Sequence, residues 1–123
     1  MTTLLKEKQI LPIYKSSAIS LIEIAYFMGI TPEILAQIIA QDIQTVEKNI
    51  ISKNVIKRIQ PLIYALQMLF ELTNYDQNEV QRWLAQPQIE WENLSPLDCL
   101  QQGNFDAVIN LISRIYYGDS AGY

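Results

Sequence analysis

The stretch VIKRIQPLIYALQMLFEL, residues 55–72, decides the fold of this chain. Its apolar residues recur at alternating steps of three and four, the period of one helix face, at Ile56, Ile59, Ile63, Leu66 and Phe70. The stretch therefore predicts the central helix of an all-α protein. Because proline cannot donate a helix hydrogen bond, Pro61 marks either a kink or a start, and we expect the helix to begin around Gln60.

The sequence before residue 55 predicts three shorter helices. The first is expected to begin at Ser16 or Ser17 and to end at Gly29, with an inner face of Ile19, Ile22, Ala25 and Tyr26. A second is expected to run from Thr31 and Pro32 to about Ala40. A third helix is expected to begin at Asp42 or Thr45, with an inner face of Ile43, Val46, Ile50 and Ile51. Residues 1–15 have poor periodicity and contain Pro12, so we expect a loosely held arm.

The sequence after residue 72 predicts three more helices, which makes about seven in all. One covers residues 79–86 and is broken by Pro87, after which a loop is expected. The next starts at Ser95 as cap, with Asp98 reaching back to it, and Gly103 ends it. The last covers residues 105–117, with an inner face of Phe105, Val108, Ile109, Ile112, Ile115 and Tyr116. No stretch alternates as a strand does.

Composition argues against most enzyme classes. The chain has 123 residues, no histidine and one cysteine, so the commonest general base and a thiolate zinc site are both missing. We expect no enzyme activity, no metal and no cofactor, and we interpret Cys99 as apolar filler rather than a reactive thiol. With no secretion signal or membrane span recognised, a cytoplasmic protein is expected.

Charge is divided unevenly along the chain. Residues 1–60 hold seven Lys and Arg against five Asp and Glu, whereas residues 61–123 hold two against eight, giving +2 and −6 and the net −4. An acidic surface repels phosphates, so the C-terminal half suits a protein partner rather than nucleic acid.

The spacing of Ala25, Gly29 and Leu35 resembles a DNA-binding helix-turn-helix at about residues 19–40. The second helix of this motif offers no positive charge to a DNA groove, and Glu33 would be repelled by phosphate. Basic residues follow instead at Lys48, Lys53, Lys57 and Arg58, which could support weak DNA binding. The alternative is that the motif is two packed helices without a DNA role.

The C-terminal third reads RWLAQPQIEWENLSPLDCLQQGNFDAVINLISRIYYGDSAGY. Its order and spacing of residues resemble the toxin-binding domain of Xre/MbcA/ParS-type antitoxins, at Trp83, Leu84, Pro87, Pro96, Leu97, Leu100, Gly103, Val108, Leu111, Arg114, Ile115 and Gly118. The sequence departs from the family where Glu92-Asn93 stands in place of the usual Gly-Gly pair. After the N-terminal arm at 1–15, the resemblance implies an Xre-like region at 16–74 with a degenerate helix-turn-helix at about 19–40, and a toxin-binding domain at 75–123 that ends in a tail.

The resemblance implies a type II antitoxin whose partner is a RES-type toxin that consumes NAD, and whose tail blocks the active site. We expect Asp119, Tyr123 and the terminal carboxylate to imitate an anionic ligand while Arg114 orients the tail. The toxin-binding residues are expected to be Trp91, Arg114, Tyr116, Tyr117, Gly118, Asp119 and Tyr123. A homodimer is also expected, with an apolar arm at Leu4, Leu5, Ile10, Leu11 and Ile13.

Two other functions stay open on the sequence. The chain could be a transcriptional autoregulator with weak operator affinity, or an adaptor that holds some other protein. Salt-dependent binding to its own upstream DNA would distinguish the first. The product of the neighbouring gene would distinguish the second.

Overall fold

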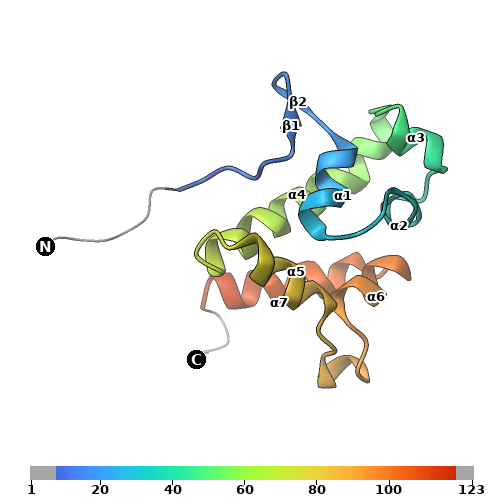
Figure 1. Ribbon diagram of the computed structural model, residues 1–123. Coiled ribbons are helices and arrows are strands. Elements are labelled where there is room, and N and C mark those ends of the chain that lie inside the picture. The colour runs from blue at the N-terminus through green and yellow to red at the C-terminus, as the bar shows by residue number, and fades with distance from the viewer. Residues whose placement is uncertain (1–7, 119–123) are drawn as a thin grey trace, which may run out of the picture.

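The computed structural model describes residues 8–118, and its regular structure is helical apart from one short two-stranded hairpin, which confirms the predicted all-α class (Figure 1). Two short strands, β1 (Tyr14–Lys15) and β2 (Ala18–Ile19), come first. The helices that follow are α1 (Leu21–Met28), α2 (Pro32–Ile38), α3 (Ile43–Glu47), α4 (Lys53–Leu72), α5 (Gln77–Ala85), the 3-10 helix η1 (Ile89–Trp91), α6 (Pro96–Gln101) and α7 (Phe105–Tyr116).

The central helix α4 begins earlier than expected, so the predicted start around Gln60 is wrong. The Ser52 side chain accepts a hydrogen bond from the Val55 amide and caps the first turn. Pro61 lies inside the helix, where it removes one backbone hydrogen bond but is exposed to solvent. Because Val55 and Ile59, which precede it, are buried in the core, their packing holds the first two turns helical despite the proline.

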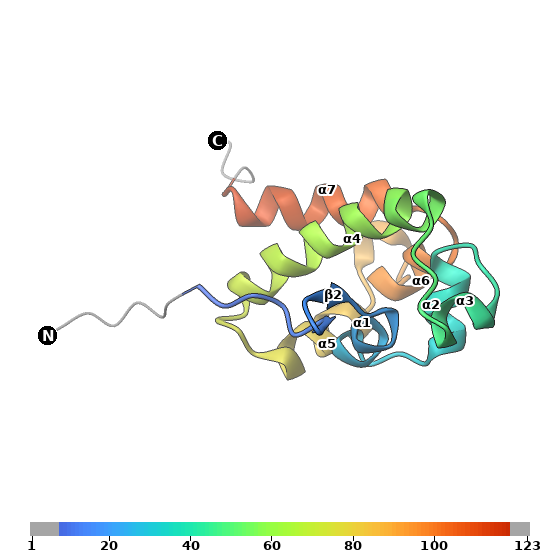
Figure 2. The ribbon, with the colours of Figure 1, turned by 90° about the horizontal axis from the view of Figure 1, so that it is seen from above.

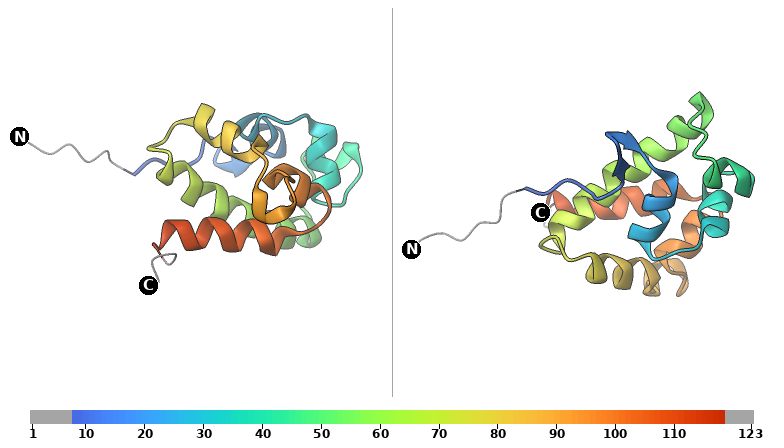
Figure 3. Two further views of the ribbon diagram at one scale, coloured as in Figure 1. Left: turned by 90° about the horizontal axis from the view of Figure 1, so that it is seen from below. Right: turned by 45° about the horizontal axis from the view of Figure 1, so that its top comes forward.

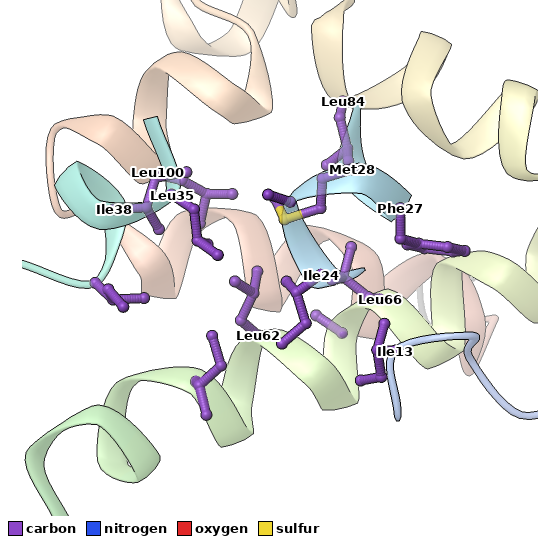
Figure 4. Packing of buried hydrophobic residues seen from close by; sticks show 14 of the residues in the cluster. Ile13, Ile24, Phe27, Met28, Leu35, Ile38, Leu62, Leu66, Leu84 and Leu100 are labelled. Carbon is purple, nitrogen blue, oxygen red and sulfur yellow. The ribbon is translucent and has the colours of Figure 1, made fainter. Parts of the chain in front are cut away.

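Buried residues from every helix except η1 form one hydrophobic core around α4 (Figure 4). Phe70 of α4 lies between Phe27 of α1 and Tyr75, with both ring pairs edge to face at centroid distances of 5.2 Å. Three residues expected to face inward are instead exposed: Tyr26, Ile50 and Ile56. The core is shared by the two halves of the chain, so neither half is packed independently.

The segment before α1 differs most from the prediction. Residues 16 and 17, where a helix was expected to begin, instead have φ of 50° and 67° and form the turn of a hairpin that pairs Tyr14 with Ile19. Leu11 and Ile13 are buried in the core, so this part of the expected loose arm is packed. Strands of two residues each are too short to show an alternation that the sequence could reveal.

The second and third helices follow the predicted start signals, because Thr31 and Asp42 cap α2 and α3. Ser20, rather than Ser16 or Ser17, caps α1. Gly29 has φ of 74° and ends α1 as predicted, and a Cβ at this position would lie 2.9 Å from Gln81 Cδ. The chain bends by 102° between α1 and α2. The sequence therefore predicted the order of these helices correctly, although α1 starts later than Ser16, at Leu21.

In the C-terminal half, α6 has the predicted capping box: the Ser95 amide donates to Asp98 Oδ2, and the Asp98 amide donates to Ser95 Oγ. Helix α6 packs on α2 and α7, whereas α7 packs most extensively on α4. Ile115, expected to face inward, is exposed. Seen from above, α4 and α7 run side by side in the same direction, so their C-terminal ends lie together (Figure 2).

Among the described helices, none alone is long and apolar enough to cross a membrane. Helices α1 and α2 reach that length and hydropathy only when taken as a pair, across the 102° bend.

Candidate protein-binding surface

A groove of about 690 Å³ runs along the outer face of α7 beside the loop that carries η1. Ala107, Asn110, Arg114 and Tyr117 follow at steps of three, four and three, which places them on one face of the helix. The groove is lined by Trp91, Ala107, Asn110, Ser113, Arg114 and Tyr117. Figure 3 shows α7 along an outer edge of the molecule.

The loop opposite α7 is a closed turn that projects from the body of the protein (Figure 1). The Gln88 amide donates to the Leu94 carbonyl at 3.0 Å, and the Asn93 amide donates to the Gln88 carbonyl at 2.9 Å. Glu92 and Asn93 have φ of 56° and 67°, the left-handed conformation in which glycine carries no Cβ penalty. The Glu-Asn pair thus adopts a backbone conformation that two glycines would adopt without strain.

The tip of this loop combines an apolar side chain with an ion pair. Ile89 is 90% exposed, which makes it the most exposed large apolar residue among those described. Next to it in sequence, Glu90 Oε2 lies 3.8 Å from Arg114 Nη2, so an ion pair links the loop to α7. Both charged side chains are about half exposed, so the link is weak and can open.

Tyr116 does not line this groove, although it is next to Tyr117 in sequence. Its hydroxyl donates a hydrogen bond of 2.5 Å to Glu71 Oε1 at the end of α4. That bond raises the pKa of Tyr116 to about 12 and holds the pKa of Glu71 below its usual value. Of the predicted toxin-binding residues, Trp91, Arg114 and Tyr117 therefore come together, whereas Tyr116 faces α4.

Gly118 follows Tyr117, the cap residue of α7, and has φ of 69°, which ends the helical path of the backbone. It is exposed. Asp119 and Tyr123, the other two predicted toxin-binding residues, lie outside the described residues.

The predicted DNA-binding residues are spread along one region of the surface. Lys57 and Arg58 line a shallow cavity of about 270 Å³ with Ile39, Ala40 and Gln41, just after α2. The Arg58 guanidinium also lies 6.0 Å from the centre of the Phe105 ring. Lys48 caps the end of α3 and Lys53 begins α4, and both are exposed. These four residues do not line the groove beside α7.

Cys99 is 2% exposed and lies in the core. Burial raises the pKa of its thiol, which opposes formation of the reactive thiolate. The interpretation of Cys99 as apolar filler fits both observations.

Sequence reasoning missed the small and polar side of the groove, namely Ala107, Asn110 and Ser113. Counting back from Arg114 by four and seven residues would have found Asn110 and Ala107, because such residues share a helix face. It also missed Glu71, whose partners Lys8 and Tyr116 lie far away in the chain. Nothing in the local sequence signals those contacts.

A comparison with protein families covers the C-terminal part of the chain. Residues 65–118 match the family described as the antitoxin Xre/MbcA/ParS C-terminal toxin-binding domain. The match begins inside α4 and contains α5, η1, α6, α7 and the whole groove. Comparisons with curated proteins and with solved structures found no significant match.

This part of the chain is helical and carries an open groove on α7. Residues 65–118 match the Xre/MbcA/ParS family of antitoxin toxin-binding domains, which confirms the resemblance seen in the sequence. The family supports an antitoxin role, and it implies a toxin as the binding partner.

Proposed function

We propose that this chain neutralises a RES-type, NAD-consuming toxin by binding it along α7 and placing the segment after Gly118 in the toxin's active-site entrance. The observation that carries the proposal is the groove beside α7, which lies inside the family match and leads directly to residue 118. Binding along α7 would fix where the following segment enters the partner.

The chemistry of the groove suits a protein partner. Trp91 and Tyr117 offer large flat surfaces with polar edges, the kind of side chain that dominates binding energy at protein interfaces. Arg114 adds a charge that can exchange its weak contact with Glu90 for a contact on the partner. Asn110 and Ser113 provide hydrogen-bonding groups between these anchors.

Inhibition by the tail follows from the charge that a NAD site requires. A pocket that binds NAD must attract phosphates, so an acidic segment can compete for the same groups. Asp119 supplies a carboxylate one residue after the turn at Gly118. In this proposal Asp119 and Tyr123 occupy the ligand's place, and Arg114 orients the segment that carries them.

Autoregulation through DNA is the second candidate, and one observation favours it: Lys57 and Arg58 lie beside the end of α2, the helix that would enter the DNA groove. Against it, α2 packs on α6, and its exposed Gln37 is hydrogen-bonded to Gln101 of α6. A DNA-reading helix needs such polar side chains free for base edges. A steep loss of affinity for its own upstream DNA with rising salt would support this second function.

The proposal is tested with the product of the gene adjacent to this chain's own gene, co-expressed and purified through a tag on this chain. Arg114→Ala and Arg82→Ala form a matched pair, because each removes an exposed arginine that pairs with a glutamate. We expect Arg114→Ala to weaken the complex about tenfold or more, a loss typical of an anchor residue, and Arg82→Ala to leave it within about twofold. Equal affinities for the two variants, or no complex with the wild-type chain, would contradict the proposal.

A further inference from the structure

The groove beside α7 is lined by side chains that donate hydrogen bonds. The indole N–H of Trp91 and the guanidinium of Arg114 can only donate, whereas Asn110 and Ser113 can donate as well as accept. Within residues 8–118, the side chains of Trp91, Asn110 and Ser113 have no hydrogen-bond partner. These free donors favour a bound group that accepts hydrogen bonds.

Charge narrows the class of that group. Among the described residues that line the groove, Arg114 is the one charged side chain, and no acidic side chain offsets it there. Arginine holds its five N–H donors in a planar fork, which matches the two oxygens of a carboxylate. The groove therefore complements a carboxylate, which is negatively charged and accepts several hydrogen bonds at once.

The chain itself offers Arg114 a carboxylate from outside the groove. Glu90 Oε2 lies 3.8 Å from Arg114 Nη2, which is longer than the roughly 2.7–2.9 Å of a charge-assisted hydrogen bond. Glu90 does not line the groove, and both side chains are about half exposed to solvent. The pair is therefore loose, and a carboxylate inside the groove can approach the guanidinium more closely and also reach Asn110 or Ser113.

We propose that the groove beside α7 binds the carboxylate of an aspartate or glutamate of the toxin, and that Glu90 competes with this carboxylate for Arg114. The inference rests on the proposed function, which places the toxin on the groove because the groove lies within the family match of residues 65–118. Pairing with the toxin at Arg114 fixes the last turn of α7 on the toxin, and in this way Arg114 orients the segment that follows.

The surroundings of Arg114 argue for a protein carboxylate that belongs to another kind of chain. Trp91 and Tyr117 line the same groove and offer apolar ring surface to the residues beside the bound carboxylate, which a free small acid lacks. A second copy of this chain is a poor source, because eight of its thirteen acidic residues lie in residues 61–123. Bringing two such halves together would oppose two net charges of −6.

The competition is tested by removing the competing charge. Glu90→Gln keeps the shape of the side chain, and we expect it to tighten the complex with the product of the adjacent gene about twofold to fivefold, the range of an exposed ion pair. The matched control is Glu92→Gln, which removes the same charge from the same loop at an exposed residue without an ion pair among the described residues. Equal tightening by both variants would mean that only long-range charge matters, and would overturn the inference.

A double-mutant cycle shows whether Glu90 acts through Arg114. In a chain that already carries Arg114→Ala, we expect Glu90→Gln to change the dissociation constant by less than about 1.5-fold, because there is no guanidinium left to compete for. A gain that persists in this background would overturn the inference. If Arg114→Ala weakens the complex but Glu90→Gln does not tighten it, the competition is wrong and the proposed function stands.

A carbodiimide, which joins an amine to a carboxylate directly, identifies the source of the carboxylate. It is applied to the complex of the chain that carries Arg114→Lys and Glu90→Gln, so that position 114 holds an amine and the competing glutamate is gone. We expect peptide mapping to find position 114 joined to an aspartate or glutamate of the toxin. Joining to a second copy of this chain, or no joining at position 114 in a complex that forms, would overturn the inference. If the wild-type chain forms no complex, both proposals fail together.

Discussion

At the scale of single residues, the hydrogen bond between Tyr116 and Glu71 shifts the pKa values of both side chains. The hydrogen bond from the Tyr116 hydroxyl is the main reason that its pKa rises from 10.0 to about 12. Because the pKa in the folded state is higher than in the unfolded state, this contact stabilises the fold below pH 10, and its contribution is lost as the pH rises toward 12. Glu71 behaves in the opposite sense: its lowered pKa means that its contribution is lost in acid.

Alkaline titration of tyrosinate absorbance checks this account. We expect the difference between the wild type and Tyr116→Phe to show one tyrosine that titrates near pH 12, and Glu71→Gln to return that tyrosine toward pH 10. In acid, the stability advantage of the wild type over Glu71→Gln should shrink as the pH falls below 4.5, the ordinary pKa of the carboxyl group. A difference spectrum with its midpoint near pH 10 would contradict the hydrogen bond.

Hydrogen bonds between residues close in the sequence could be predicted, whereas hydrogen bonds between distant residues could not. Thr31, Asp42 and Ser95 cap helices that begin directly after them, so their roles follow from local order. In contrast, Asn49 accepts from the Leu21 amide at 2.7 Å and donates to the Ile19 carbonyl at 2.9 Å, across about thirty residues. Only the tertiary fold brings these groups together.

At the scale of elements, the loop at residues 86–94 carries backbone strain at Glu92. Glu92 has φ of 56°, a conformation that costs a residue with a Cβ about 1 kcal/mol. We expect Glu92→Gly to raise the free energy of unfolding by up to about 1 kcal/mol in urea denaturation. The matched control is Glu90→Gly in the same loop, at a residue without positive φ. If both variants lower stability equally, Glu92 is not strained.

Two elements, helix α4 and the hairpin of β1 and β2, differ from the sequence-based expectation for reasons of tertiary packing. Pro61 is a helix breaker by its local chemistry, yet packing of Val55 and Ile59 against the core outweighs the single hydrogen bond that it removes. The hairpin of β1 and β2 is too short to show alternation, and its turn uses Ser16 and Ser17 at positive φ rather than the usual glycine or asparagine. Both features depend on tertiary packing.

At the scale of the whole molecule, the helical class and the order of the helices could be predicted because apolar periodicity and caps agree along most of the chain. The groove could be predicted only in part: Trp91, Arg114 and Tyr117 meet at it, whereas Tyr116 turns to α4. Helix α4 packs on α7 and is also hydrogen-bonded to the N-terminal segment through Gln67, so the two halves of the chain are joined at the end of α4.

The rate of NAD loss with the product of the adjacent gene, measured against the full chain and against a chain truncated after Tyr117, tests the central claim most directly. The truncation keeps α7 and the groove and removes the residues from Gly118 onward. We expect the full chain to suppress NAD loss and the truncated chain still to bind the toxin but not to inhibit it. A truncated chain that inhibits as strongly as the full one would contradict inhibition by the tail.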